Sequence, residues 1–152
     1  MQRQNNIVAI YGDTLYQLDE TYTKIPKLRS NPKYRMPFCH QSVFVKTSLL
    51  KAYKFDTDFK ICADNEFFTK VYNAGGEFLQ CDMIVSVYDS NGVSSTPSLR
   101  FCKEELKIGQ RYNKAYFLYF LPKYLWNVCK YGVRALLPRN LANALRSVYN
   151  AK

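Results

Sequence analysis

Residues 36–68 have the sequence MPFCHQSVFVKTSLLKAYKFDTDFKICADNEFF. This stretch is the most informative part of the chain for predicting the order of its helices and strands. Its first part, Pro37–Val45, contains aromatic residues, ends in Val-Phe-Val and predicts a strand. A short helix follows over Thr47–Tyr53, with Thr47 as a suitable N-cap. The last part predicts a helix that Asp64 caps and that runs to about Ala74, with Phe67, Phe68, Val71 and Tyr72 at helical spacing.

Two strand patterns flank this stretch. Ile7–Tyr11 is a continuous apolar run, which is typical of a strand buried on both faces in the parallel part of a sheet. Phe78–Tyr88 alternates between apolar and polar residues, with Leu79, Met83 and Val87 in the apolar set, and predicts a half-buried strand. Together with the helices between them, these patterns predict an α/β chain with a small mixed sheet and flanking helices.

The sequence after this second strand predicts helices. Thr96-Pro97 is a favourable N-cap and first-turn pair for a helix that ends near Tyr112. The pattern stays helical from Asn113 onward, with a break or kink expected at Pro122. We therefore expect an α/β part over residues 1–112 and a helical extension over residues 113–152.

The C-terminal segment from residue 99 onward carries most of the net charge. The chain has a formal charge of +10, and 11 of its 22 Lys and Arg residues lie in residues 99–152 with only 2 of its 12 acidic residues. Lys123, Lys130 and Arg134 fall on one helical face, opposite an apolar stripe. This segregation favours an anionic membrane surface as partner; single-stranded nucleic acid and simple solvation of the charges remain alternatives.

Composition limits the class of protein. A hydrophobic content of 47% is sufficient for a packed core. The five cysteines are widely spaced, with no Cys-x-x-Cys pair, which predicts reduced thiols in a cytosolic compartment. The N-terminus has no signal-peptide pattern, and no apolar run approaches the ~20 residues that a membrane-spanning helix needs.

The carboxylates of Asp64 and Glu66, in Ala-Asp-Asn-Glu, are the first candidate site. An inverting sugar transfer needs one carboxylate as general base, which takes the proton as the acceptor oxygen attacks the anomeric carbon. The structural alternative is that Asp64 caps the helix and Glu66 complements the helix dipole. The two interpretations are compatible, because a helix terminus can also hold a catalytic carboxylate rigidly.

His40 and the sequence Asp56-Thr57-Asp58 are two further candidates. A single histidine on an apolar strand is more typical of a hydrogen-bonded structural residue, and the chain has no second histidine for a zinc site. The Asp-x-Asp spacing is one with which sugar-nucleotide enzymes hold a divalent cation. Here it follows a short helix instead of a buried strand, so the pattern predicts a turn and no metal site in this chain.

Taken in order, these segments resemble a known family. The matching segments are Tyr11–Asp13, Pro37–Gln41, Tyr53–Asp56, Ile61–Asp64, Gly75–Phe78, Ile84–Tyr88 and Gly92–Ser95. Their order resembles the C-terminal, acceptor-side half of a bacterial family-two inverting glycosyltransferase of the GT-A type. The resemblance covers about residues 7–112, and the order of its parts is more specific than any one part.

The resemblance implies roles by position. Asp64 corresponds to the general base for the acceptor hydroxyl. Glu66 and Asn65 correspond to supporting residues, and His40 and Gln41 line the acceptor side. These roles imply transfer from a nucleotide-sugar donor to a growing capsule, exopolysaccharide or lipopolysaccharide chain, or to a lipid-linked acceptor.

A loop and the C-terminus carry two further predictions. The polar loop with Gly92 and Ser94 is interpreted from its composition as a mobile lid over a site, and the alternative is a plain connection. The basic C-terminal helices resemble segments that seat such enzymes on a membrane. A cytoplasmic, peripheral location on the inner face of the bacterial inner membrane is therefore expected.

The family's N-terminal half has no counterpart before Ile7. In the family, that half binds the nucleotide sugar and holds Mg²⁺ or Mn²⁺. We therefore expect this chain to bind no cofactor itself, to be inactive without a donor-binding half, and to self-associate through an exposed sheet edge. The alternative from another class is a non-catalytic basic module that binds a membrane surface or nucleic acid.

Overall fold

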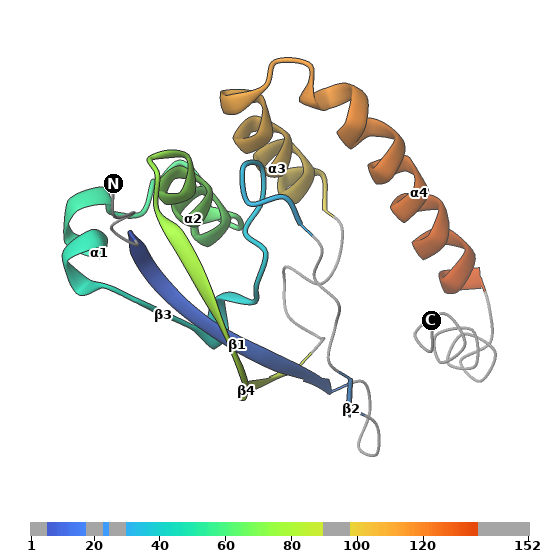
Figure 1. Cartoon of the computed structure of the whole chain (residues 1–152). Helices are drawn as coiled ribbons and strands as arrows, with labels where there is room; N and C mark the ends of the chain where they lie inside the picture. The colour runs from blue at the N-terminus through green and yellow to red at the C-terminus, as the bar shows by residue number, and fades with distance from the viewer. Residues whose placement is uncertain (1–5, 18–22, 25–29, 90–97, 137–152) are drawn as a thin grey trace. The chain divides into compact units, whose positions relative to one another are not determined.

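The computed structural model describes residues 6–17, 23–24, 30–89 and 98–136 (Figure 1). The elements in these residues are β1 (Ile7–Gln17), β2 (Thr23–Lys24), the 3-10 turn η1 (His40–Ser42), β3 (Val43–Val45), α1 (Thr47–Tyr53), α2 (Ala63–Asn73), β4 (Glu77–Asp89), α3 (Leu99–Tyr112) and α4 (Tyr116–Leu136). The chain divides into two compact units, Met1–Tyr116 and Phe117–Lys152, of which the first contains the sheet.

Strand β1 lies at the centre of a mixed sheet. β4 pairs with β1 in parallel, and β2 and β3 pair with it antiparallel (Figure 1). In the register of the sheet, Ile10 of β1 lies between Phe44 of β3 and Leu79 of β4. The predicted α/β class is confirmed, and so is the prediction that residues 7–11 enter a parallel pair of strands.

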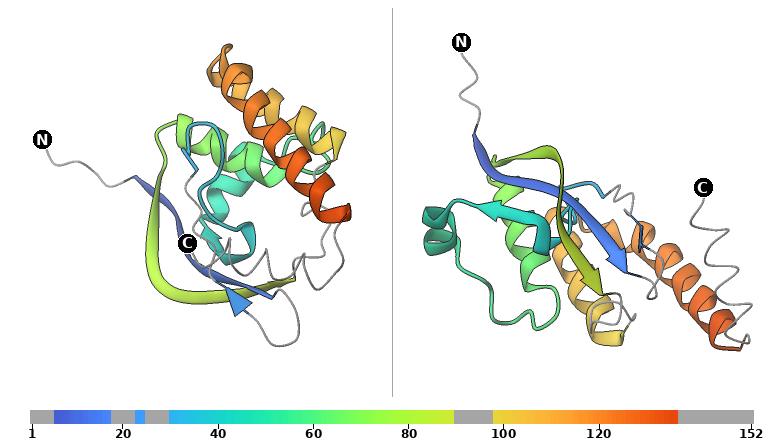
Figure 2. Two further views of the ribbon diagram at one scale, coloured as in Figure 1. Left: turned by 90° about the vertical axis from the view of Figure 1, so that its right-hand side faces the viewer. Right: turned by 90° about the horizontal axis from the view of Figure 1, so that it is seen from below.

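A close approach between β1 and β4 explains why Gly12 interrupts an apolar strand. The register shifts between Tyr11 and Asp13, where β4 contains extra residues. A Cβ atom on Gly12 would lie 2.5 Å from the Met83 carbonyl oxygen and 2.6 Å from Val85 Cγ2. β4 is strongly curved along its length (Figure 2). Only glycine lets the two backbones come this close where the strand bends.

Helix α2 supplies the core that covers one face of the sheet. Its buried residues Phe67, Phe68 and Val71 form one cluster with Val8 of β1 and with Phe38. Phe38 packs edge-to-face on Phe68, with ring centroids 4.9 Å apart. The helical spacing of the apolar residues in α2 was therefore a correct indication of its buried face.

The opposite face of the sheet is apolar and exposed in this chain. Ile10, Phe44 and Leu79 lie side by side across three strands, with exposed fractions of 41, 66 and 44%. Met83 and Val87 are exposed as well. The predictions that residues 7–11 are buried on both faces, and that the apolar set of β4 faces inward, are wrong. The physical reason is that α2 covers only the other face.

Three predicted element boundaries are corrected by hydrogen bonding. The strand predicted over Pro37–Val45 contains only residues 43–45, because the chain turns through η1, where the Ser42 N–H bonds to the Cys39 carbonyl. The N-cap of α1 is Lys46 and not Thr47. The N-cap of α2 is Cys62, so Asp64 lies within the first helical turn instead of capping it.

Glu104 of α3 anchors the segment that leads into α2. Its carboxylate accepts hydrogen bonds from the backbone N–H groups of Lys60, Ile61 and Cys62 at 2.9–3.1 Å. Burial favours a raised pKa for Glu104, but the three N–H donors and Arg100 outweigh it and lower the pKa. This contact fixes the start of α2 against α3.

The helices α3 and α4 differ from prediction at single residues. Ser98 caps α3, and its hydroxyl accepts the Phe101 N–H at 3.1 Å; Thr96-Pro97, the predicted cap, lies outside the described residues. α4 continues through Pro122, so of the two predicted alternatives, a break or a kink, the break is wrong. Pro122 is exposed and removes only one backbone hydrogen bond from a long helix. In the described part of the chain, no helix has the length and apolar character needed to cross a membrane.

Candidate functional site

The structure brings together His40 and Asp64, which lie 24 positions apart in the sequence. The Nδ1 atom of His40, in η1, lies 2.7 Å from Oδ2 of Asp64, in the first turn of α2. The His40 side chain is 45% exposed and that of Asp64 is 25% exposed. A carboxylate–imidazole pair that solvent can reach is suited to accepting a proton from a bound hydroxyl.

A cluster of three hydroxyl groups holds η1 against the sheet. Ser42 is fully buried, and its Oγ lies 2.5 Å from Oγ1 of Thr14 in β1 and 2.6 Å from Oγ of Ser86 in β4. Because β1 and β4 are parallel and both residues lie past the strand midpoints, η1 sits toward the carboxyl end of this pair. His40 begins the same turn, so its position is tied to the sheet.

The amide of Asn65 fixes the other side of the pair. Asn65 is buried, and its Oδ1 accepts the backbone N–H of Met36 at 2.9 Å. This bond connects the first turn of α2 to the segment that leads into η1. Asn65, predicted as a supporting residue, therefore holds the two parts of the candidate site in register.

Sequence reasoning missed Ser42, Thr14, Ser86 and Glu104 as residues that position the site. A signal was present for the three hydroxyl residues, because each interrupts or follows an otherwise apolar strand pattern. Glu104 gave no such signal, since a glutamate within a helix is more typically exposed to solvent.

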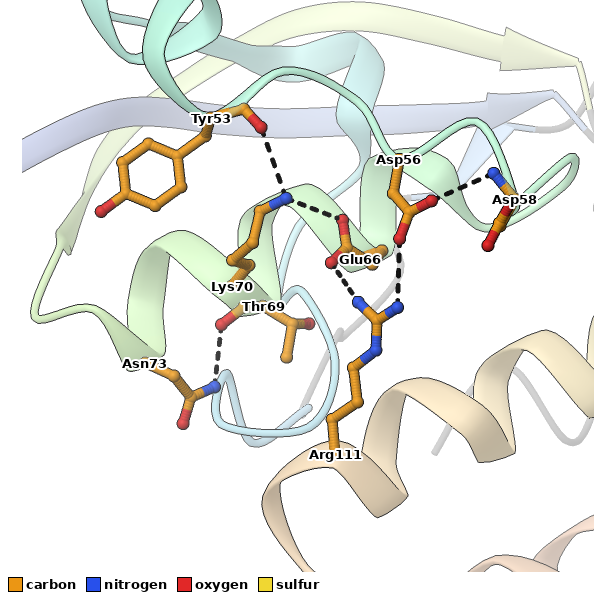
Figure 3. Close-up of polar contacts among 8 residues, drawn as sticks. All are labelled: Tyr53, Asp56, Asp58, Glu66, Thr69, Lys70, Asn73 and Arg111. Atoms are coloured by element: carbon orange, nitrogen blue, oxygen red, sulfur yellow. Dashed lines mark hydrogen bonds and ion pairs between the residues drawn. The ribbon is translucent and has the colours of Figure 1, made fainter.

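Glu66 belongs to a different cluster from Asp64. Residues two apart on a helix point in different directions, and Glu66 is only 2% exposed. Its Oε1 lies 2.5 Å from Nη1 of Arg111, and Lys70 Nζ lies 3.3 Å from its Oε2 without hydrogen-bond geometry (Figure 3). Glu66 is thus part of an ion-pair network between α2 and α3, and does not join His40 and Asp64.

Asp56, the first carboxylate of the Asp-x-Asp sequence, is in the same network. Its Oδ2 lies 3.0 Å from Nη2 of Arg111, and its Oδ1 accepts the Asp58 N–H at 3.0 Å (Figure 3). The Asp58 N–H, followed by Arg111, lowers the pKa of Asp56. The predicted turn is confirmed, and the Asp56 carboxylate is paired with an arginine.

Among the described residues there is no group of three or more His, Cys, Asp or Glu side chains that would hold a metal ion. The five cysteines are free thiols. Burial, followed by the charges of Glu105, Glu104 and Asp64, raises the pKa of the Cys62 thiol to about 12. Cys62 is therefore protonated at neutral pH and is not an activated nucleophile.

The remaining predicted residues lie at or beyond the edges of this site. Gln41 is exposed in η1, next to His40. Gly92 and Ser94 lie outside the described residues. Lys123 is half-buried in α4, with its Nζ 5.9 Å from the centroid of the Tyr119 ring; for Lys130 and Arg134 the structure describes only the helical backbone.

Helix α4 exposes a large apolar surface. Its exposed apolar side chains are Phe117, Leu118, Tyr119, Leu121, Leu125, Trp126 and Val128. Leu118, Leu121, Leu125 and Val128 follow helical spacing along one face, whereas Lys123 lies on another. This is the distribution expected of a helix that lies at an interface.

Comparisons with known proteins add no relative. No protein-family model, no curated protein and no solved structure matches this chain.

Proposed function

We propose that this chain is the acceptor-side part of a nucleotide-sugar-dependent glycosyltransferase with a GT-A-like fold. The observation that carries the proposal is the contact of His40 with Asp64 at 2.7 Å on an accessible part of the domain. The resemblance of the sequence to family-two enzymes assigns Asp64 as general base. The structure supports the assignment by pairing Asp64 with the one imidazole of the chain.

The position of the pair in the sheet also supports a binding role. In α/β proteins, ligands bind beyond the carboxyl ends of parallel strands, where the connecting segments leave a crevice. η1 is attached to the carboxyl-terminal halves of β1 and β4 through Ser42. An acceptor hydroxyl beside His40 and Asp64 would therefore occupy the usual place for a ligand in this class of fold.

The chemistry needs one proton acceptor and one leaving group. The hydroxyl oxygen of the acceptor forms a bond to the anomeric carbon of the donor sugar. The bond from that carbon to the diphosphate breaks, and the nucleoside diphosphate leaves with the electron pair. The pair of His40 and Asp64 takes the hydroxyl proton, which prevents positive charge from building up on the attacking acceptor oxygen.

The donor side of the reaction would come from outside the described residues. GT-A enzymes hold the donor diphosphate with a divalent cation, here expected to be Mg²⁺ or Mn²⁺. The Asp56 carboxylate does not fit this task, because Arg111 already binds it. Nucleotide-sugar binding and the cation are therefore proposed for the complete enzyme and not for these residues.

A transfer assay tests this proposal. Membranes from cells that express the chain from its native locus, with any polypeptide encoded upstream, are incubated with radiolabelled nucleotide sugars. We expect label in a glycan or lipid-linked product, and at least a ~100-fold loss with Asp64→Asn. Asp58→Asn is the matched control and should retain activity. Equal label in a strain lacking the gene, or full activity of Asp64→Asn, would contradict the proposal.

A second candidate function rests on α4. Its exposed apolar face, together with the 11 Lys and Arg residues and only two acidic residues of segment 99–152, supports binding to an anionic membrane surface. Such binding would either seat a peripheral enzyme at the inner membrane or be the sole activity of a non-catalytic module. Trp126 is the only tryptophan of the chain and is 65% exposed, so its emission reports insertion directly.

We expect a blue shift of the Trp126 emission with vesicles that contain anionic lipid, and none with neutral vesicles. Leu125→Glu should abolish the shift, because it places a charge on the apolar face of α4. Tighter binding to a single-stranded oligonucleotide than to anionic vesicles would instead support the nucleic-acid alternative.

A further inference from the structure

We infer that the proton of the acceptor hydroxyl enters through Nε2 of His40, and that Asp64 positions the imidazole. This inference rests on the proposed function and specifies which atom of the pair meets the substrate. Sequence reasoning assigned the proton to Asp64 and gave His40 a place beside the acceptor. The geometry of the pair favours the reverse order of contact.

The hydrogen bond between the two side chains has only one possible direction. An ionised carboxylate only accepts hydrogen bonds, so at 2.7 Å from Oδ2 of Asp64 the Nδ1 atom of His40 must be the donor. A neutral imidazole carries one proton on its two nitrogens. With that proton on Nδ1, Nε2 presents a free lone pair and is the basic atom of the ring.

The imidazole of His40 is more accessible to a substrate than the carboxylate of Asp64. Both carboxylate oxygens of Asp64 already accept protein donors, Oδ2 from His40 and Oδ1 from the Asn65 N–H at 2.7 Å. The His40 side chain is almost twice as exposed, at 45% against 25% for Asp64. Within the described residues, Nε2 of His40 has no protein partner. An incoming hydroxyl thus meets the imidazole edge before it meets the carboxylate.

Hydrogen bonds hold both members of the pair in place. His40 opens η1, and Ser42 at the end of the turn is clamped between Thr14 and Ser86. Asp64 is held from the other side through Asn65 and the Met36 N–H. A base gains from such fixed geometry, because the reacting atoms do not need to be oriented at the moment of reaction.

The proposed step balances without another reactant. The acceptor O–H bond breaks and its proton binds Nε2, giving an imidazolium whose charge Asp64 stabilises. The acceptor oxygen forms the new bond to the anomeric carbon, and the nucleoside diphosphate leaves with the electron pair of the broken bond. His40 releases the proton to solvent before the next turnover.

The tautomer of His40 is measurable on the chain as it exists, without donor or acceptor. His40 is the only histidine, so nitrogen-15 histidine labelling gives one pair of ring signals. The measurement is made in alkaline buffer, because the tautomer is a property of the neutral imidazole. We expect the proton on Nδ1 and a bare Nε2, whereas free histidine favours a proton on Nε2.

Variants test the role of Asp64 in the same measurement. Asp64→Asn should shift the tautomer toward the Nε2-protonated form, because the amide NH₂ can donate to Nδ1. Asp58→Asn, which removes an exposed carboxylate from the turn, should leave the tautomer unchanged. A wild-type ring protonated on Nε2, or a tautomer insensitive to Asp64→Asn, would overturn the inference and leave the proposed transferase activity in place.

The transfer assay provides the second readout. We expect His40→Gln to lower transfer by about 10²–10⁴-fold, as for loss of a general base. Full transfer by His40→Gln together with loss of transfer in Asp64→Asn would show that the carboxylate accepts the proton directly, and would overturn the inference. Absence of transfer by the wild-type protein would instead refute the proposed function, while the tautomer still reports on the pair itself.

Discussion

Replacing Glu104 tests how the candidate site is held in place. This carboxylate of α3 is 8% exposed and accepts the N–H groups that precede and begin α2. Asp64 lies two residues after the last of these donors, Cys62. We predict that Glu104→Gln destabilises the domain, and that the start of α2 is loosened more than the sheet.

The magnitude follows from the bonds that each variant removes. Oε2 of Glu104 accepts from Ile61 and Cys62 at 2.9 Å, and Oε1 accepts from Lys60 at 3.1 Å and faces Arg100 Nε at 3.2 Å. A hydrogen bond to a charged group contributes about 1.5–3 kcal/mol. Glu104→Gln keeps one oxygen, so it should cost about 2 kcal/mol. Glu104→Ala leaves three N–H groups unpaired and should cost about 3–4 kcal/mol.

The pH dependence has a definite sign. Because the folded-state pKa of Glu104 is lowered, its contribution to the free energy of unfolding is complete above the unfolded-state value of about 4.3. It is lost as the pH falls through the lower, folded-state pKa. The difference between wild type and Glu104→Gln should therefore be constant near neutral pH and shrink in acid.

Urea unfolding followed by far-UV circular dichroism measures these differences. Hydrogen exchange of residues 60–68 locates them, and should show faster exchange in Glu104→Gln at the start of α2. Glu77→Gln, at the exposed first residue of β4, removes the same charge and serves as control. Equal urea midpoints for wild type and Glu104→Gln, or a difference that grows in acid, would refute the reasoning.

Three further predictions concern the sheet. Ser42→Ala should cost about 1–3 kcal/mol in urea unfolding, because Thr14 and Ser86 lose their common partner; unchanged stability would show that the cluster is not needed. Gly12→Ala should lower the melting temperature clearly, because its Cβ would meet the Met83 carbonyl oxygen at 2.5 Å, and an unchanged melting temperature would mean that β4 relaxes easily. Phe44→Ser should reduce self-association in sedimentation velocity, since Phe44 is 66% exposed on the apolar face of the sheet; a wild-type monomer at all concentrations would exclude association through this face.

The sequence alone was sufficient to predict most of the elements. Alternation along Phe78–Tyr88 predicted β4, and the apolar spacing after Asp64 predicted α2, because both patterns arise from local repeat geometry. Errors occurred where a distant partner overrides the local preference. His40 is not in a strand, since Ser42 bonds to side chains on β1 and β4 and draws the chain into a turn.

The sequence also identified His40 and Asp64 separately as candidate site residues. Each had a structural alternative, a hydrogen-bonded histidine for His40 and a helix cap for Asp64. Their contact at 2.7 Å joins two segments of the chain that local patterns cannot relate. The same limit applies to Glu66, whose spacing in the sequence suggested a place beside Asp64. It is instead buried and paired with Arg111, 45 positions away.

The sequence by itself therefore determined the α/β class, the positions of β1, β4, α2 and α3, and a short set of residues able to carry chemistry. Only the tertiary structure decided which of them meet, which carboxylate is buried among cations, and which face of the sheet α2 covers. The reason is physical. Local periodicity specifies which residues share one face of an element, but ion pairs and hydroxyl clusters depend on how elements distant in sequence pack.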